Sequence, residues 1–186
     1  MLESAAEDEY NPVITHTATM KTTKGDIELE LYGEDAPKTV KNFVGLAEQD
    51  IYDEVLFHRV IEKFMIQGGD PNTKDKPSSM WGRGGQSIYG GGFADELDPE
   101  APSSQRGYVA GALAMANAGP NTQSSQFFII TTNDGAKHLP YAYTLFGYVS
   151  SGMDVVLAIA KGEGNPPADP VKILDVETRE YIKIKD

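Results

Sequence analysis

The segment FHRVIEKFMIQGGDP, residues 57–71, contains two short apolar runs followed by turn-forming residues. It predicts two short strands. Because side chains alternate between the faces of a strand, Met65 and Gln67 are expected on one face, beside Arg59 of the neighbouring strand. Phenylalanine and methionine in a strand are core residues in most proteins. Arg59 does not fit a core, since an arginine among apolar residues needs a partner or access to solvent.

A second segment, GALAMANAGPNTQSSQFFIITT at residues 111–132, has a similar organisation. An apolar run, an Asn-Ala-Gly-Pro-Asn turn and another apolar run follow one another. On its own, the segment predicts two strands joined by a polar loop.

Further apolar runs occur along the whole chain. Helices are predicted at residues 37–48 and 152–160, where apolar side chains recur at helical spacing and Pro37 suits a first helical turn. Short strands with one early and one late helix predict an all-β (mainly β) fold, a closed eight-stranded antiparallel β-barrel capped by two α-helices. Such a barrel is filled by its own side chains, so a binding site is expected on its outer face. The predicted strands are residues 18–23, 26–32, 55–61, 64–67, 112–115, 127–131, 145–149 and 171–176.

The composition fits one globular domain. The chain has 186 residues, of which 40% are hydrophobic and 24% are charged. Its net charge of -12 disfavours nucleic acid and anionic lipid surfaces as partners. The first twelve residues hold four carboxylates and no basic side chain. Residues 1–14 therefore predict a flexible acidic tail, and residues 15–186 a single domain.

No stretch has the pattern of a signal peptide or the length of a membrane span, so we expect a cytoplasmic protein. This expectation leaves open that a leader upstream of this sequence was removed. The absence of cysteine excludes a disulfide framework, a thiol nucleophile and a thiolate zinc site. The three histidines lack the spacing of metal ligands. The glycine-rich run GRGGQSIYGGG at residues 82–92 matches neither the dinucleotide-binding fingerprint nor the phosphate-binding loop. No metal and no cofactor are therefore expected.

The two segments quoted above resemble the two signature stretches of the cyclophilin family, in the family's order and at about its separation. GGQSIYGGGF at residues 84–93, APKTVKNF at 36–43 and LFG at 145–147 match as well, so the resemblance covers about residues 18–176. It implies a cyclophilin-like barrel and a peptidyl-prolyl cis/trans isomerase. Such an enzyme rotates X-Pro bonds in peptides and unfolded proteins, assists protein folding, and needs no metal, cofactor or covalent intermediate.

The resemblance also implies roles for individual residues. Arg59 would be the catalytic guanidinium, and Gln67 its neighbour that hydrogen-bonds the substrate. The backbone of Asn117 would bind the residue before the proline. The proline ring is expected in an apolar pocket formed by Phe64, Met65, Phe128 and Leu139. The other substrate-binding residues that the resemblance implies are His58, Ala116, Ala118, Gln126, His138 and Tyr143.

Three features depart from the family's pattern. His138 stands where many members have a tryptophan at the pocket rim, and Tyr143 stands where a histidine is common. By resemblance that tryptophan helps to bind cyclosporin, so weakened inhibition is expected. A loop insertion at about residues 71–82 contains the only tryptophan, Trp81. Just after it, Arg83 is expected to border a secondary pocket and to favour acidic side chains upstream of the proline.

Rotation about a peptide bond neither makes nor breaks a covalent bond, so a catalyst only has to bind the twisted amide better than the planar forms. The expected partners are proline-containing peptides and unfolded protein clients, and a monomer is expected. An alternative is a module that binds proline segments, or acts as a chaperone or in assembly, with turnover secondary. In the assembly role, the insertion around Trp81 and the acidic tail would recruit a partner, whereas otherwise Trp81 would pack on the barrel.

Overall fold

The computed structural model describes residues 10–183, and residues 1–9 and 184–186 lie outside the described range. The predicted acidic tail, residues 1–14, therefore falls largely outside it. The described end of that segment contacts the domain, because the carbonyl of Tyr10 accepts a hydrogen bond from Arg106 Nη2 at 3.0 Å. The flexibility of the tail and its boundary at residue 15 stay predictions.

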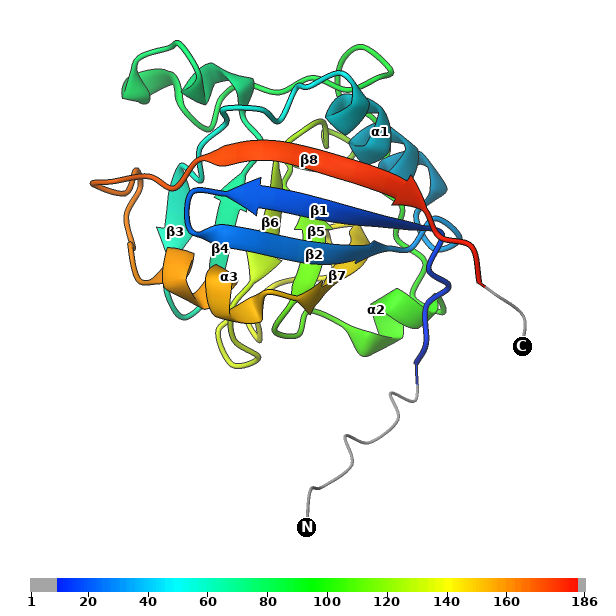
Figure 1. The fold of residues 1–186 in the computed structure, drawn as a ribbon. Coiled ribbons are helices and arrows are strands. Elements are labelled where there is room, and N and C mark those ends of the chain that lie inside the picture. The colour runs from blue at the N-terminus through cyan, green and yellow to red at the C-terminus, as the bar shows by residue number, and fades with distance from the viewer. Residues whose placement is uncertain (1–9, 184–186) are drawn as a thin grey trace.

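Eight strands form one antiparallel sheet that curls on itself (Figure 1). The strands are β1 (His16–Thr22), β2 (Gly25–Leu31), β3 (Arg59–Ile61), β4 (Met65–Gly68), β5 (Ala112–Met115), β6 (Phe127–Ile130), β7 (Leu145–Ser151) and β8 (Ile173–Glu180). Their order in the sheet is β3-β4-β6-β5-β7-β2-β1-β8. Isolated bridges between Leu56 and Lys172 and between Val60 and Gly164 connect the two ends of this order. The curled sheet is thus closed between its two ends by single bridges rather than by a continuous ladder.

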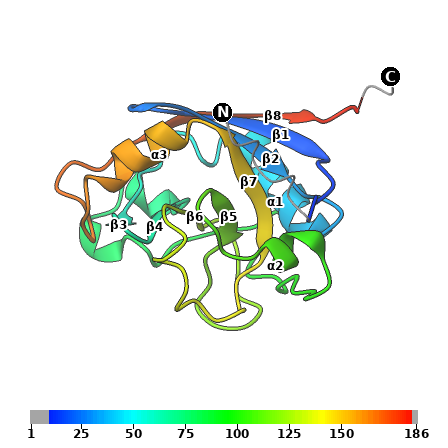
Figure 2. The same cartoon turned by 90° about the horizontal axis from the view of Figure 1, so that it is seen from below.

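Helices flank the curled sheet (Figures 1 and 2). The helices α1 (Pro37–Glu48) and α3 (Met153–Ala160) lie at opposite ends of it, and the short helix α2 (Pro102–Arg106) lies beside β7. Two 3-10 turns, η1 (Pro71–Thr73) and η2 (Ser78–Met80), lie in the inserted loop. Within residues 10–183 no helix combines the length and the apolar character needed to cross a membrane.

The start of α1 is capped from a distant loop. Pro37 occupies its first turn, and Ala36 offers no capping side chain. The carboxylate of Glu96 instead accepts hydrogen bonds from the backbone N–H groups of Lys38 and Thr39, at 3.0 and 2.8 Å. These bonds satisfy two donors that a helix leaves unpaired in its first turn, where a negative charge is also favourable.

The mainly β fold with eight antiparallel strands confirms the sequence prediction. Helix α1 begins and ends at the predicted residues. The predicted strand 55–61 is shorter in the sheet, because the residues before Arg59 bond to the segment that precedes β8. There, Phe57 N–H donates to the carbonyl of Val171 at 2.9 Å. Helix α2 and the 3-10 turns are additional to the two predicted helices, since three to five residues carry too little periodicity to predict a helix.

The main core lies inside the curl of the sheet. Side chains alternate along β4 and β6, so Ile66, Phe127 and Ile129 point into this core and are fully buried. Helix α1 adds Phe43, whose ring centroid lies 5.1 Å from that of Tyr52 and 5.9 Å from that of Phe127. These aromatic contacts bury a large apolar area and fill the interior.

The opposite face of β4, β5 and β6 carries a second, smaller apolar cluster. Met65, Ala114, Phe128 and Ile130 belong to it and are buried, whereas Ile66, Leu113 and Ile129 on the same strands belong to the main core. Partly buried side chains from the loops pack against this outer cluster, namely Phe64, Ala116, Leu139 and Tyr143. The fold therefore presents an apolar floor on its outer wall, where the sequence predicts the binding site.

Candidate functional site

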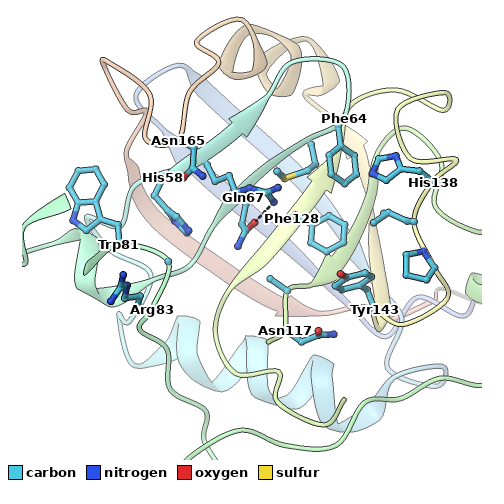
Figure 3. Close-up of a pocket in the computed structure, with 16 residues that line it drawn as sticks. His58, Phe64, Gln67, Trp81, Arg83, Asn117, Phe128, His138, Tyr143 and Asn165 are labelled. Carbon is cyan, nitrogen blue, oxygen red and sulfur yellow. Dashed lines mark hydrogen bonds between the residues drawn. The ribbon is translucent and has the colours of Figure 1, made fainter. Parts of the chain in front are cut away.

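A cavity of about 530 Å³ opens over this outer face (Figure 3). Its size is within the range of ligand-binding pockets. The predicted site residues that line it are His58, Arg59, Phe64, Met65, Gln67, Arg83, Ala116, Asn117, Phe128, His138, Leu139 and Tyr143. The two other predicted residues, Ala118 and Gln126, line a second cavity of about 250 Å³ that shares several of these residues. The structure thus brings the predicted site together.

Arg59 and Gln67 are cross-strand partners on β3 and β4. Arg59 Nη1 donates a hydrogen bond to Gln67 Oε1 at 3.2 Å. Gln67 Nε2 donates to Gln126 Oε1 at 3.0 Å, and so the polar side chains form a chain along the cavity wall. The guanidinium of Arg59 is partly exposed and forms no ion pair with a residue in the described range. Its charge is therefore available to a ligand.

The apolar recess beside Arg59 is formed by Phe64, Met65, Phe128 and Leu139. Met65 and Phe128 are only 1% and 5% exposed, so they form its floor. The register between β4 and β6 pairs Gln67 with Phe128, which puts the polar pair next to the recess. As the alternation predicts, Met65 and Gln67 share the outer face of β4, while Ile66 between them belongs to the main core.

His138 and Tyr143 form the rim of this recess. The ring centroids of Phe64 and His138 are 4.7 Å apart, with an angle of 62° between the rings. The ring centroids of Phe128 and Tyr143 are 5.5 Å apart at 85°. Tyr108 fixes the backbone of Tyr143, because its hydroxyl donates to the carbonyl at 2.7 Å and accepts from the N–H at 3.0 Å. The two residue substitutions among the departures from the family's pattern, His138 and Tyr143, therefore both line the cavity.

Asn117 lies where the two cavities meet. Its side chain is engaged within the protein, because Nδ2 donates to the carbonyl of Ala142 at 2.9 Å and Oδ1 accepts from Gly119 N–H at 3.1 Å. Its backbone N–H and C=O form no hydrogen bond with another residue in the part of the chain that the structure describes. An extended peptide that follows the cleft can pair with these two groups.

The second cavity is bordered by Gly82 and Arg83 on the loop side and by Ala116, Asn117 and Ala118 on the strand side. The side chain of Arg83 is exposed, and it forms no ion pair within residues 10–183. Arg83 therefore stands at the border of a secondary pocket with its charge open to a ligand.

His58 lies beneath the inserted loop and is only 3% exposed. Burial lowers the pKa of His58 below the ordinary value for histidine, and the nearby carboxylate of Asp70 opposes this effect. A side-chain carbon at Gly82 would lie 3.5 Å from His58 Nε2, so the loop covers the imidazole closely. His58 is therefore a buried part of the cavity wall, and its charged form is disfavoured there.

Four residues that line the first cavity were not among the predicted site residues: Trp81, Gly82, Pro140 and Asn165. Trp81 stands out in the sequence as the only tryptophan, but no pattern indicates that its loop folds back onto the cleft. Asn165 comes from the segment between α3 and β8. Figure 3 shows it near His58, and only the curl of the sheet brings these two residues together.

Comparison with known proteins gives consistent matches. A family model described as cyclophilin type peptidyl-prolyl cis-trans isomerase/CLD matches residues 17–178. Peptidyl-prolyl cis-trans isomerase-like 1 of Rhizopus delemar is 48% identical over 148 residues, which cover 78% of this chain and 82% of that protein. Peptidyl-prolyl cis-trans isomerase-like 1 of Mus musculus is 46% identical over 158 residues, which cover 83% and 87%.

Solved structures agree with these sequence matches. The crystal structure of a cyclophilin type peptidyl-prolyl cis-trans isomerase of Cryptosporidium parvum has a TM-score of 0.75 and 32% identity, covering 91% of this chain and 100% of that chain. A structure of the same protein in the presence of the dipeptide Ala-Pro has a TM-score of 0.72 and 34% identity, covering 86% and 96%.

Proposed function

The chain belongs to the cyclophilin-type peptidyl-prolyl cis-trans isomerase family, and from this premise we propose that Arg59, Gln67 and the apolar recess beside them rotate X-Pro peptide bonds. The isomerase activity follows from the family and from relatives at 46% and 48% identity that are named peptidyl-prolyl isomerases. The alternative, a binding or assembly module in which turnover is secondary, is not favoured by these relatives. The role of each residue is the proposal.

The reaction makes modest demands on a catalyst. Twisting a peptide bond costs roughly 18 to 20 kcal/mol, because the amide loses resonance between nitrogen and carbonyl. No covalent bond is made or broken, so a site that binds the twisted amide more tightly than the planar forms accelerates the rotation. The catalyst therefore needs no acid, no base and no nucleophile.

Arg59 supplies the group that the twisted amide needs. Loss of resonance returns a lone pair to the prolyl nitrogen, which then becomes a hydrogen-bond acceptor. The guanidinium carries several N–H donors in one plane, so Arg59 can keep its bond to Gln67 Oε1 and still donate to the substrate. This free donor capacity, on a charged group beside an apolar recess, is the single observation that carries the proposal.

The recess formed by Phe64, Met65, Phe128 and Leu139 would hold the proline ring. An apolar floor suits the methylene groups of the ring, and it holds the prolyl nitrogen near Arg59 while the carbonyl side turns. The planar amide is the more polar form, so partial desolvation in the recess would also disfavour the ground state. We propose that this desolvation contributes less than the hydrogen bond from Arg59.

The other side of the bond has to be held still. Asn117, with its backbone groups open and its side chain fixed to Ala142, suits the residue before the proline. Shortening a time of tens of seconds to milliseconds takes about 5 to 6 kcal/mol of differential binding. One hydrogen bond from a charged donor contributes roughly 1.5 to 3 kcal/mol of this. The remainder comes from holding the ring and the upstream backbone in place.

The substrates are proposed to be proline-containing peptides and unfolded protein segments, in which X-Pro bonds populate both isomers. The related structure determined with Ala-Pro supports this class of ligand. The net charge of -12 supports proteins over nucleic acid as partners. We also propose that the protein is a monomer, which light scattering would measure, and that it is located in the cytoplasm.

His138 at the rim should weaken inhibition by cyclosporin. Nanomolar inhibition in a peptide assay would contradict this expectation.

The experiment that tests the proposed roles is an isomerisation assay on an Ala-Pro tetrapeptide, with the wild-type chain and Arg59→Ala. We expect kcat/KM to fall about 10- to 150-fold, which is the loss of one charged hydrogen bond. Circular dichroism should show an unchanged fold, because Arg59 is only partly buried. A rate for Arg59→Ala close to that of the wild type would exclude the guanidinium mechanism.

A further inference from the structure

We propose that Trp81 and the inserted loop form a third subsite of the cleft, which takes a large apolar or aromatic side chain from the segment that precedes the prolyl bond. The inference rests on the proposed function, because it concerns how the same cleft reads a longer substrate. It goes beyond the proline recess and the pocket at Arg83, since it gives the insertion at about residues 71–82 a place in substrate recognition.

The loop is built around one buried carboxylate. Asp70 is fully buried, and its Oδ1 accepts a hydrogen bond from Asn72 N–H at 2.9 Å. Its Oδ2 accepts from the N–H groups of Gly82 and Gly84, at 2.6 and 3.2 Å. The carboxylate thus joins the first residues of the insertion to the residues that follow it. A loop fixed at both ends in this way holds Trp81 in a defined position.

The tryptophan itself is held by two further bonds. Its indole Nε1 donates to the carbonyl of Lys76 at 2.9 Å, and its backbone N–H donates to Ser78 at 3.2 Å. The side chain of Asn72 donates to the carbonyl of Met80, one residue earlier, at 3.1 Å. Because the only polar atom of the indole is already paired, the ring offers a ligand its apolar face. Little rotamer freedom remains to be lost on binding.

The position of Trp81 fits a peptide that continues upstream from the proline. Figure 3 shows Trp81 and Arg83 at one end of the cleft and Phe64 and His138 at the other, with Gln67 between them. Arg83 lines both cavities, and Trp81, two residues before it, lines the first. A chain that leaves the proline recess toward the pocket at Arg83 therefore passes along the wall to which Trp81 belongs.

The chemistry of this wall selects the class of side chain. Trp81 is partly exposed, and it lines the first cavity together with the largely buried His58, whose charged form is disfavoured by burial. A cation could also bind an indole face, but the guanidinium of Arg83 lies next to it and would repel a lysine or an arginine. Aromatic and large aliphatic side chains gain from packing against tryptophan without that penalty.

Fluorescence gives a direct test, because Trp81 is the only tryptophan in the 186 residues. The probes are blocked peptides with five alanines and one proline, in which a single phenylalanine replaces the alanine two, three or four residues before the proline, or one residue after it. We expect a saturable change in tryptophan emission with phenylalanine at one upstream position, and a much smaller change with the all-alanine peptide. A change seen only with phenylalanine after the proline would overturn the proposal.

Kinetics on the same peptides separates recognition from structural support. The quantity compared is the ratio of kcat/KM for the best phenylalanine peptide to kcat/KM for the all-alanine peptide. We expect this ratio to fall about 3- to 10-fold in Trp81→Ala and by less in Trp81→Phe. Met80→Ala is the matched control, since Met80 is exposed and does not line the cavity, and it should leave this ratio unchanged. An unchanged ratio in Trp81→Ala, with both rates lowered equally, would reduce Trp81 to a structural role. Wild-type turnover of the all-alanine peptide tests the isomerase function separately.

Discussion

Gln126 donates a hydrogen bond from Nε2 to the carbonyl of Gly84 at 2.6 Å. Gln126 directly precedes β6, which carries Phe128 of the proline recess, and Gly84 directly follows Arg83. Gln126 also accepts the bond from Gln67, so one amide joins the catalytic pair to the loop that borders the secondary pocket. The position of Arg83 relative to the proline recess is therefore defined by the fold.

The first prediction concerns the charge of Arg83. Peptides with glutamate two residues before the proline should be turned over faster than those with lysine, because the exposed guanidinium borders the second cavity. Exposed ion pairs are worth at most about 1 kcal/mol, so the preference should be about fivefold or less and should weaken in high salt. Arg83→Thr should remove the preference in a peptide-series assay. The same ranking of peptides in wild type and variant would rule this role out.

The second prediction concerns the floor of the recess. Phe128→Ala should lower the free energy of unfolding by about 3 kcal/mol, because a nearly buried aromatic ring leaves a cavity behind. It should also lower peptide affinity, since the ring forms part of the proposed proline pocket. Urea denaturation and peptide titration measure the two effects. Loss of stability with unchanged affinity would mean that the proline ring binds elsewhere.

The third prediction concerns the carboxylate under the inserted loop. Asp70→Ala would leave the N–H groups of Asn72, Gly82 and Gly84 without their acceptor, and we expect about 2 to 4 kcal/mol of lost stability. The indole of Trp81 should become more accessible, so an external quencher should reduce its fluorescence more strongly. Asp75→Ala is the control, because its side chain is 72% exposed, and it should change neither quantity. Equal quenching in Asp70→Ala and wild type would show that the loop does not depend on Asp70.

The fourth prediction concerns pH. Burial lowers the pKa of His58 in the folded state relative to the unfolded value of about 6.5, so the unfolded chain binds the proton more readily. The contribution to stability is therefore present above about pH 6.5 and is lost as the pH falls through the lower, folded pKa. As the pH falls from 7 to 5, the free energy of unfolding should therefore decrease less in His58→Gln than in the wild type. Parallel pH profiles for the two proteins would contradict the assignment.

The parts of the fold that follow from local pattern agree with the structure. Helix α1 follows from Pro37 and from apolar side chains that repeat at helical spacing. The shared outer face of Met65 and Gln67 follows from strand alternation, and their meeting with Arg59 follows from a short hairpin. These features depend on residues close together in sequence, which is why the sequence suffices for them.

Features that depend on distant segments are not predictable in the same way. The predicted strand at 55–61 is shortened because its first residues bond to the segment before β8, more than a hundred positions later. The places of Trp81 and Asn165 in the cleft depend on how two long loops fold back over the sheet. Glu96 caps α1 from 57 residues away, and no cap signal stands beside the helix itself.

In the proposed mechanism, the planar donor array of Arg59 stabilises the twisted amide. The most direct measurement is the cis/trans exchange rate of an enzyme-bound Ala-Pro peptide by NMR, comparing Arg59→Lys with the wild type. Lysine keeps the charge but loses the planar array of donors. We expect an exchange rate at least about tenfold slower in Arg59→Lys, with peptide affinity changed less than about threefold. Exchange at the wild-type rate in Arg59→Lys would contradict this mechanism.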